Sequence, residues 1–198
     1  MSASKLKYFI IYKPYKILSQ FSDEDGNVGL GSIYSLPKDV YPVGRLDLDS
    51  EGLLLLTNDK KLNHRLLDPK YKHWRTYWAE VEGIPKQTVF QQLQLGVTIN
   101  IGGKKHQTLP AKVKIVSPEN IYPREPSVNY IKHPETTWIE LSLIEGKNRQ
   151  VRKMTAKVGH PTLRLVRVGI EELSVMPMKP GDITQISQKA LYKKLKLS

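Results

Sequence analysis

The stretch GRLDLDSEGLLLLTND, residues 44–59, carries the strongest structural signal in this sequence. Its second half, Gly52 to Thr57, is a short apolar run, which is typical of a buried β-strand. Its first half is a polar loop that holds one arginine and three carboxylates directly before that strand. Functional side chains are often placed on loops that rigid elements support, so this loop is a candidate site. A surface turn with solvated charges is the alternative interpretation.

A helix is predicted at residues 60–67, KKLNHRLL, directly after this strand. Asn58 and Asp59 precede it, and their short polar side chains suit the cap of a helix. The Asp68-Pro69 pair then ends it. Three leucines fall on one face of this helix: Leu62, Leu66 and Leu67.

Further strands are predicted from alternating and apolar patterns. The Gly102-Gly103 pair is expected to form the turn between two short strands. The ranges with strand patterns are 7–12, 74–83, 97–116, 136–146 and 163–175.

Two more helices are predicted from apolar spacing and end signals. One follows Pro85 and ends at Gly96, and the other is a basic helix within 147–160 that Gly159 closes. The residues near one face of the first helix are Val89, Leu93 and Leu95.

Three segments lack a clear pattern. Residues 21–37 are polar and loop-like, with room for one helical turn, and residues 117–135 contain four prolines and form a long expected surface loop. Residues 182–198 are a basic, lysine-rich tail. Neither a repeat nor a flexible linker is evident, so one compact α+β domain is expected.

The charge favours a polyanionic partner. Lys and Arg number 31 against 19 Asp and Glu, which gives a formal net charge of +12. Each basic side chain placed on a phosphate releases counterions, so nucleic acid is the expected partner. A basic surface without a partner is the alternative.

The sequence contains no cysteine, which excludes disulfides, thiolate nucleophiles and thiolate zinc sites. This composition fits a reducing compartment. The apolar stretch from Tyr8 to Tyr12 is too short for a signal peptide or a membrane span. We therefore expect a soluble, cytoplasmic protein, with a monomer as the default state.

A second candidate segment is EGKNRQVRK, residues 145–153, which follows a predicted strand and opens the basic helix. A helix N-terminus with basic side chains around it suits a phosphate or a buried carboxylate. Basic helices that only face solvent are common, so this segment alone is weak evidence.

Together the two segments resemble a known family, the RsuA-type pseudouridine synthases. The resemblance covers residues 7–181 and includes the branch that modifies large-subunit ribosomal RNA, in particular the RluE-type enzymes. The matching motifs stand in order: YKP at 12–14, GRLDLDSEGLLLLTND at 44–59, RTYWAEVEG at 75–83 and EGKNRQVRKMTAKVGHPTLRLVRVGI at 145–170.

The resemblance implies an α+β fold with a mixed, mainly antiparallel sheet flanked by helices, and two subdomains around a central cleft. It also implies a single catalytic domain over residues 1–198. The small N-terminal S4 RNA-binding module of many relatives is expected to be missing, because only about six residues precede the first matching strand. RNA affinity is then expected from the basic surface, and the 117–135 loop is a candidate contributor.

Asp47, in the RLD motif, matches the catalytic carboxylate of this family. The implied reaction breaks the N1–C1′ bond of uridine, turns the uracil and joins C5 to C1′. Because this is an isomerisation, the resemblance implies no cofactor and no metal. One carboxylate can serve, either as a nucleophile or as a base that removes a sugar proton, and the sequence leaves both routes open.

Two further residues match catalytic positions of the family. Arg152 matches the basic partner of the aspartate, which would keep that carboxylate ionised. Tyr77 matches the active-site tyrosine, whose ring can stack on uracil and whose hydroxyl can assist loss of the C5 proton. A surface or phosphate-binding arginine and a core tyrosine are the respective alternatives.

The other expected site residues bind RNA. Arg45 matches an arginine associated with base extrusion, which the chemistry requires because a stacked nucleotide hides its glycosidic bond. Val151 is expected to contact the base. Three basic residues are assigned to RNA or solvent: Lys147, Arg149 and Lys153.

The target implied by the resemblance is 23S ribosomal RNA or a large-subunit assembly intermediate. Small-subunit ribosomal RNA and transfer RNA remain alternatives, as does a non-catalytic RNA-binding assembly factor. A glycoside or nucleoside hydrolase that uses Asp47 with Asp49 or Glu51 is a further alternative. Such hydrolysis needs two carboxylates spaced across the bond, which fits the expected Asp47 and Arg152 less well.

Overall fold

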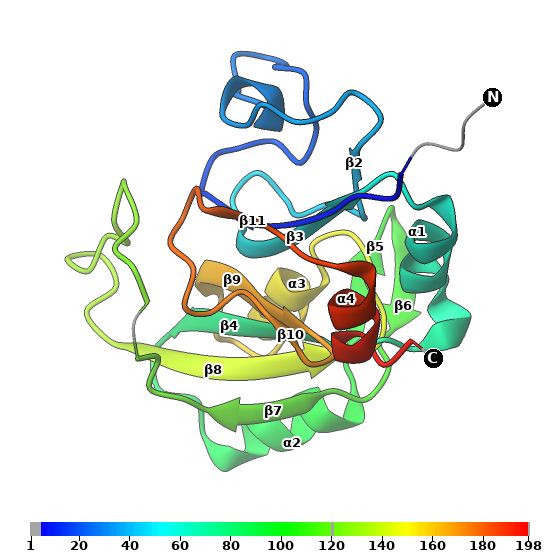
Figure 1. Ribbon diagram of the computed structural model, residues 1–198. Helices are drawn as coiled ribbons and strands as arrows, with labels where there is room; N and C mark the ends of the chain where they lie inside the picture. Colours follow the sequence, from blue (N-terminus) through cyan, green and yellow to red (C-terminus); the bar gives the residue numbers. More distant parts are fainter. Residues whose placement is uncertain (1–4, 120, 198) are drawn as a thin grey trace. The chain divides into compact units, whose positions relative to one another are not determined.

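The computed structural model describes residues 5–119 and 121–197 (Figure 1). The chain divides into two units. Unit 1 comprises Met1–Tyr71 and Val168–Ser198, and unit 2 comprises Lys72–Arg167. Strand β9 (Thr162–Ile170) begins in unit 2 and ends in unit 1. Two units agree with the two subdomains that were expected. None of the described helices is long and apolar enough to cross a bilayer.

Unit 1 is built around β1 (Tyr8–Lys13) and β3 (Glu51–Thr57), which pair in antiparallel register. The second edge of β1 pairs with β11 (Ile183–Gln185), and β2 (Tyr41–Pro42) pairs with β3. All seven residues of β3 are buried, so its apolar run serves both faces of the sheet. The remaining elements are η1 (Leu30–Ser32), α1 (Lys60–Leu67), η2 (Pro69–Tyr71), β10 (Leu173–Ser174) and α4 (Gln188–Lys194).

Helix α1 has the predicted bounds and the predicted cap. The Asp59 carboxylate accepts hydrogen bonds from the backbone N–H groups of Lys61 and Leu62. Leu62 and Leu66 are buried, whereas Leu67, on the same predicted face, is 44% exposed. Leu67 is the last helical residue, where the apolar face has already turned towards solvent.

The expected C-terminal tail is part of the packed structure of unit 1. Strand β11 and helix α4 form within it, and the apolar side of the helical region is buried through Leu191, Leu195 and Leu197. The Tyr192 and Tyr8 hydroxyls both donate to Oδ2 of Asp59, over 2.9 and 2.8 Å. Helix α4 is thereby tied to the first strand and to the cap of α1.

Asp59 is therefore expected to contribute more to stability than a surface carboxylate. Burial raises its pKa, but the bonds from Leu62, Tyr8, Tyr192 and Lys61 outweigh burial, so the pKa lies below 3.8. A lowered native pKa means that this contribution is present at neutral pH and is lost as the pH falls below the unfolded-state pKa.

We expect Asp59→Ala to lower the free energy of unfolding by about 3 kcal/mol at pH 7, since it removes a cap and leaves two tyrosine hydroxyls without their acceptor. Urea unfolding at pH 7 and pH 3 is the measurement, and the difference from wild type should shrink at pH 3. Asp68→Ala is the control, because Asp68 pairs with the exposed Lys70. Equal effects of both substitutions would contradict the assigned role.

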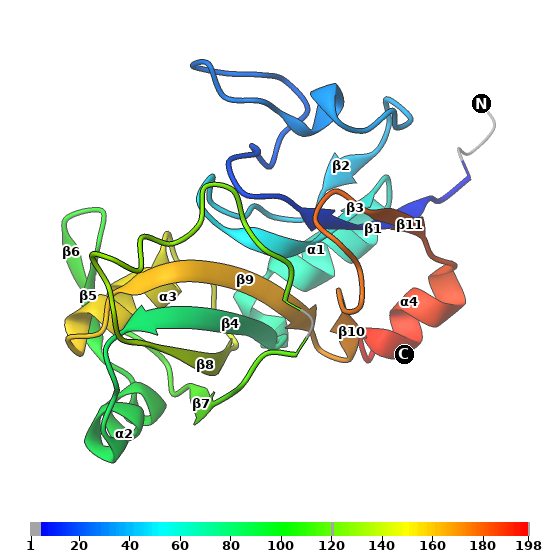
Figure 2. The ribbon, with the colours of Figure 1, turned by 90° about the vertical axis from the view of Figure 1, so that its left-hand side faces the viewer.

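Unit 2 contains a sheet with the order β9, β4, β8, β7 and a separate hairpin of β5 and β6 (Figure 2). Strand β4 pairs antiparallel with β8, and β8 pairs antiparallel with β7. The elements are β4 (Arg75–Glu82), α2 (Gln87–Leu95), β5 (Thr98–Ile101), β6 (Lys104–Gln107), β7 (Lys112–Ile115), β8 (Thr136–Leu143) and α3 (Gln150–Lys157).

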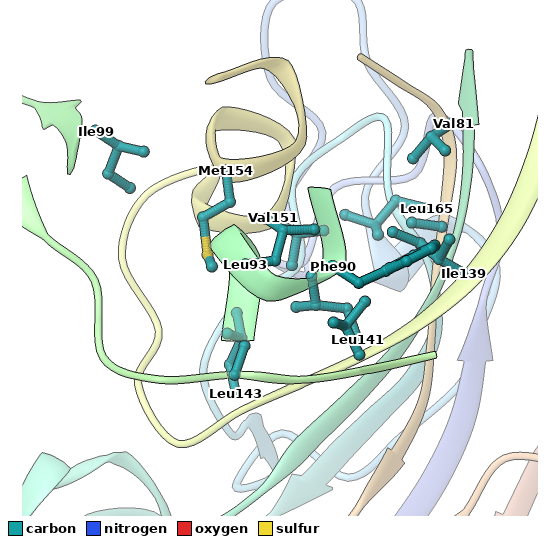
Figure 3. Close-up of a cluster of buried hydrophobic side chains, with 13 residues drawn as sticks. Val81, Phe90, Leu93, Ile99, Ile139, Leu141, Leu143, Val151, Met154 and Leu165 are labelled. Atoms are coloured by element: carbon teal, nitrogen blue, oxygen red, sulfur yellow. The ribbon is translucent and has the colours of Figure 1, made fainter. Parts of the chain in front are cut away.

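One face of this sheet carries the hydrophobic core of unit 2 (Figure 3). Ala79 of β4 lies opposite Ile139 of β8, and the helices add Phe90, Leu93 and Met154 to the same cluster. Of the residues predicted near one face of α2, Leu93 is buried and Leu95 is 77% exposed, and the prediction did not include the buried Phe90. Gly96 caps this helix with φ of 89°, as expected for a glycine at this position.

The opposite face of the sheet carries charged side chains that bond residues 121–135 of the loop. His133 bonds Glu82 through Nδ1 and Oε1 over 2.8 Å, and Arg164 donates to the carbonyl of Tyr122 over 2.8 Å. The described part of the loop, 117–119 and 121–135, contains neither helix nor strand, which confirms the prediction of a loop.

Candidate active site

The loop that carries Arg45 and Asp47 connects β2 to β3 in unit 1 and is held at both ends. The Val43 N–H donates to the Leu55 carbonyl over 2.8 Å, and the Ser50 N–H donates to the Asp47 carbonyl over 3.0 Å. Gly44 has φ of +70°, and a Cβ added there would lie 2.9 Å from Leu67 Cδ2. A glycine is therefore needed where the loop leaves β2 and passes α1.

The middle of the loop is held by a segment that lies 27 residues earlier in the chain. The Leu46 N–H donates to Oγ of Ser19 over 3.0 Å, and the Ser19 hydroxyl donates to the Leu46 carbonyl over 2.8 Å. The Lys16 N–H donates to the Leu48 carbonyl over 2.9 Å. Both neighbours of Asp47 are thus fixed, while Asp47 itself is half-buried and Arg45 is exposed.

The segment that holds the loop is itself fixed by Lys13 of the YKP motif. The Lys13 side chain is fully buried, and its ammonium donates to the carbonyls of Pro14 and Ile17 over 2.9 and 2.7 Å. The Leu18 N–H bonds the Val28 carbonyl over 2.8 Å. The turn that presents Ser19 is therefore rigidly connected to β1.

Tyr77 lies in β4 of unit 2, opposite Leu141, and its half-buried side chain packs against the core cluster. The predicted alternation of β4 is confirmed by its other face. There the Thr76 hydroxyl lies 2.9 Å from the Ser142 hydroxyl, and the Trp78 indole donates to Glu140 over 3.1 Å. The Tyr77 side chain thus projects to the side of α2 and α3, whose residues form that cluster.

The second candidate segment enters α3 later than expected, since the helix begins at Gln150. Arg149 precedes it with a left-handed backbone, φ of 52°, and is exposed together with Lys147. Arg152 donates to the Thr162 carbonyl through Nη1 over 3.0 Å. Two further predicted site residues have clear positions: Lys153 Nζ lies 3.4 Å from Asn148 Oδ1, and Val151 is buried in the core cluster.

A buried polar network supports the start of α3. Oε1 of Glu145 accepts from the Gln150 amide over 2.6 Å and from the Leu109 N–H over 2.8 Å. Oε2 of Glu145 lies 3.1 Å from Nε2 of His106 on β6. Oε1 of Gln150 accepts from the Lys147 N–H over 2.9 Å. These contacts fix the turn that carries the exposed basic side chains.

The predicted site residues therefore fall into two groups. Arg45 and Asp47 share one loop of unit 1, and the other six lie on β4 or on the segment around the start of α3 in unit 2. The pairing of Asp47 with Arg152 stays a prediction. Sequence patterns did not indicate Ser19 or Gln150, because a single serine or glutamine carries no periodic signal.

The network around Glu145 leads to a stability prediction. We expect Glu145→Ala to lower the free energy of unfolding by about 3 kcal/mol, since the Leu109 N–H and the buried Gln150 amide lose a charged acceptor. Urea denaturation provides the measurement. Glu135→Ala, at an exposed position of the same unit, should change stability by less than about 0.5 kcal/mol. A loss at Glu145 as small as at Glu135 would refute the role of the network.

Comparison with known proteins adds a family to this geometry. The sequence profile described as RNA pseudouridylate synthase matches residues 7–157. A protein of Vibrio parahaemolyticus named ribosomal large subunit pseudouridine synthase E is 45% identical over 180 residues, which cover 91% of this chain and 74% of the relative. The protein of that name from Xanthomonas axonopodis pv. citri is 48% identical over 173 residues, covering 86% of this chain and 89% of the relative.

A solved structure has the same fold. The crystal structure of a pseudouridylate synthase superposes with a TM-score of 0.80 at 23% identity, covering 98% of this chain and 76% of that one. The α+β fold expected from the sequence and the family resemblance are thus confirmed.

Proposed function

Because the chain belongs to the RNA pseudouridylate synthase family, we propose that it isomerises uridine to pseudouridine in the 23S ribosomal RNA of the large subunit. The observation that carries the proposal is the GRLD loop of unit 1, in which the backbone on both sides of Asp47 is fixed. Relatives named for the ribosomal large subunit, at 43 to 48% identity, support this choice of RNA.

The reaction requires no net change in composition or oxidation state. The N1–C1′ bond breaks, the uracil turns, the C5–C1′ bond forms, and the proton on C5 is replaced by one on N1. Asp47 supplies the carboxylate that acts on the sugar or the base, as a nucleophile or as a base. A group that is fixed before the substrate arrives loses little entropy in the reaction, which suits a loop held at several points.

The residues of unit 2 supply the other proposed functions. Tyr77 stacks on the uracil and assists loss of the C5 proton, and Val151 forms part of the apolar surface on which a base can rest. Arg152 is the basic partner that keeps a catalytic carboxylate ionised. Its bond to the Thr162 carbonyl uses one guanidinium nitrogen and fixes the direction of the group.

RNA binding is assigned to four basic residues that are exposed or half-buried. Arg45 lies on the loop of Asp47 and is placed to fill the space that an extruded nucleotide leaves. Lys147, Arg149 and Lys153 surround the start of α3, where they neutralise phosphates. A monomer acting in the cytoplasm without a cofactor is part of the same proposal, and the lack of cysteine fits a reducing compartment.

The activity is tested by pseudouridine mapping on unmodified 23S ribosomal RNA. We expect wild-type protein to create a new site without added metal or cofactor, and Asp47→Asn to create none while it retains its affinity for RNA. Release of free uracil instead would support a hydrolase. RNA binding without any modified site, on this and on other RNAs, would favour an assembly factor.

The RNA-binding assignment is tested by salt dependence. We expect Arg149→Ala to weaken binding to the substrate RNA that the mapping identifies. The slope of the logarithm of the observed association constant against the logarithm of the salt concentration should become smaller by about 1, since one phosphate contact is lost. Fluorescence anisotropy across a salt series is the measurement. Lys86→Ala, an exposed residue that precedes α2, should leave the slope unchanged. An unaltered slope in Arg149→Ala would remove this residue from the interface.

A further inference from the structure

We propose that Ser19 is a positioning residue for Asp47, an inference that rests on the proposed function of Asp47. The Ser19 side chain does not belong to the loop of Asp47, and it bonds both polar backbone groups of the residue directly before it. The arrangement assigns to one hydroxyl the orientation of the catalytic carboxylate.

The geometry is specific because of which peptide groups are held. The Leu46 carbonyl belongs to the peptide bond that joins Leu46 to Asp47, so its bond to Ser19 fixes the plane on the N-terminal side of the Asp47 Cα. On the C-terminal side, the Asp47 carbonyl accepts from Ser50 and the Leu48 carbonyl accepts from Lys16. The direction of the Asp47 Cα–Cβ bond follows from these fixed planes.

A hydroxyl is the group that this position requires. It donates one hydrogen bond and accepts others, so it can satisfy an N–H and a carbonyl of the same residue. Ser19 is 5% exposed and Leu46 is 7% exposed, so neither backbone group has ready access to water as a substitute. Removing the hydroxyl leaves both groups of Leu46 without their partner.

The base from which Ser19 acts is rigid. Lys13 closes the turn of residues 14–17 with its buried ammonium, and the Leu18 N–H is bonded to Val28. Lys16 adopts the left-handed region with φ of 57° and points its N–H at the Leu48 carbonyl. Because the segment that carries Ser19 is fixed, the loop of Asp47 can move only if the hydrogen bonds between Ser19 and Leu46 break.

The expected effect is on the rate of the chemical step. Misplacement of a catalytic group by about 1 Å can cost about 100-fold in rate. We expect Ser19→Ala to lower the single-turnover rate constant on saturating RNA by about 10- to 100-fold, with RNA affinity unchanged. Ser19→Thr, which restores a hydroxyl, should recover most of the rate.

The experiment compares wild type, Ser19→Ala, Ser19→Thr and Ser32→Ala in single-turnover pseudouridylation of the mapped RNA. Ser32→Ala is the matched control, because its hydroxyl bonds the Asp23 carboxylate in the same unit, outside the loop of Asp47. A purely structural role would reduce the active fraction, and hence the amplitude, whereas positioning reduces the rate constant at full amplitude.

Each outcome decides the proposal. A slow Ser19→Ala at full amplitude, with Thr rescue and a normal Ser32→Ala, supports it. A wild-type rate constant in Ser19→Ala, or a loss of amplitude alone, overturns it while the proposed function stands. If Ser19→Ala does not fold, Ser19→Cys takes its place, since a thiol is a weaker hydrogen-bonding group, and a wild-type rate there overturns the proposal. Wild-type protein that modifies no RNA overturns the proposed function itself.

Discussion

Burial of β3 on both faces is the constraint on which the organisation of unit 1 depends. Leu53, Leu54, Leu55 and Leu56 are each fully buried, so a shift of register by one residue would exchange apolar contacts on both sides of the sheet at once. Pairing with β1 along six residues fixes that register further. The point at which β3 begins is thereby fixed, and with it the end of the loop that carries Asp47.

The loops that carry the proposed site are held by buried polar groups. Ser19 satisfies the backbone of Leu46, and Glu145 satisfies Leu109 and Gln150. A buried polar group without a partner costs about 1–3 kcal/mol, so these contacts contribute to stability and to geometry together. Substitutions at such residues therefore need a readout that separates a slower reaction from a smaller folded fraction, which the amplitude and rate constant of a single turnover provide.

The sequence predicted what short-range patterns determine. The apolar run of β3, the Asp59 cap and the alternation of β4 are local properties, and each was predicted correctly. Spacing placed Leu67 and Leu95 on the apolar faces of their helices, but each is the final residue of its helix and is exposed. Helix α4 was not predicted, because its short sequence is rich in lysine and its apolar face gives only a weak pattern. The contact between Ser19 and Leu46 joins distant segments, and no periodicity reports such a contact.

Hydrogen bonds of Lys13, Lys16 and Ser19 connect the YKP motif to the GRLD loop. A fully buried lysine is costly unless its ammonium is hydrogen-bonded, and Lys13 meets that condition by closing the turn after β1. That turn places Lys16 and Ser19 against the residues on either side of Asp47. Lys13 contributes to the proposed site through the backbone that its ammonium holds. The YKP motif at 12–14 and the GRLD motif, more than 30 residues later, thus both help to fix the backbone around Asp47.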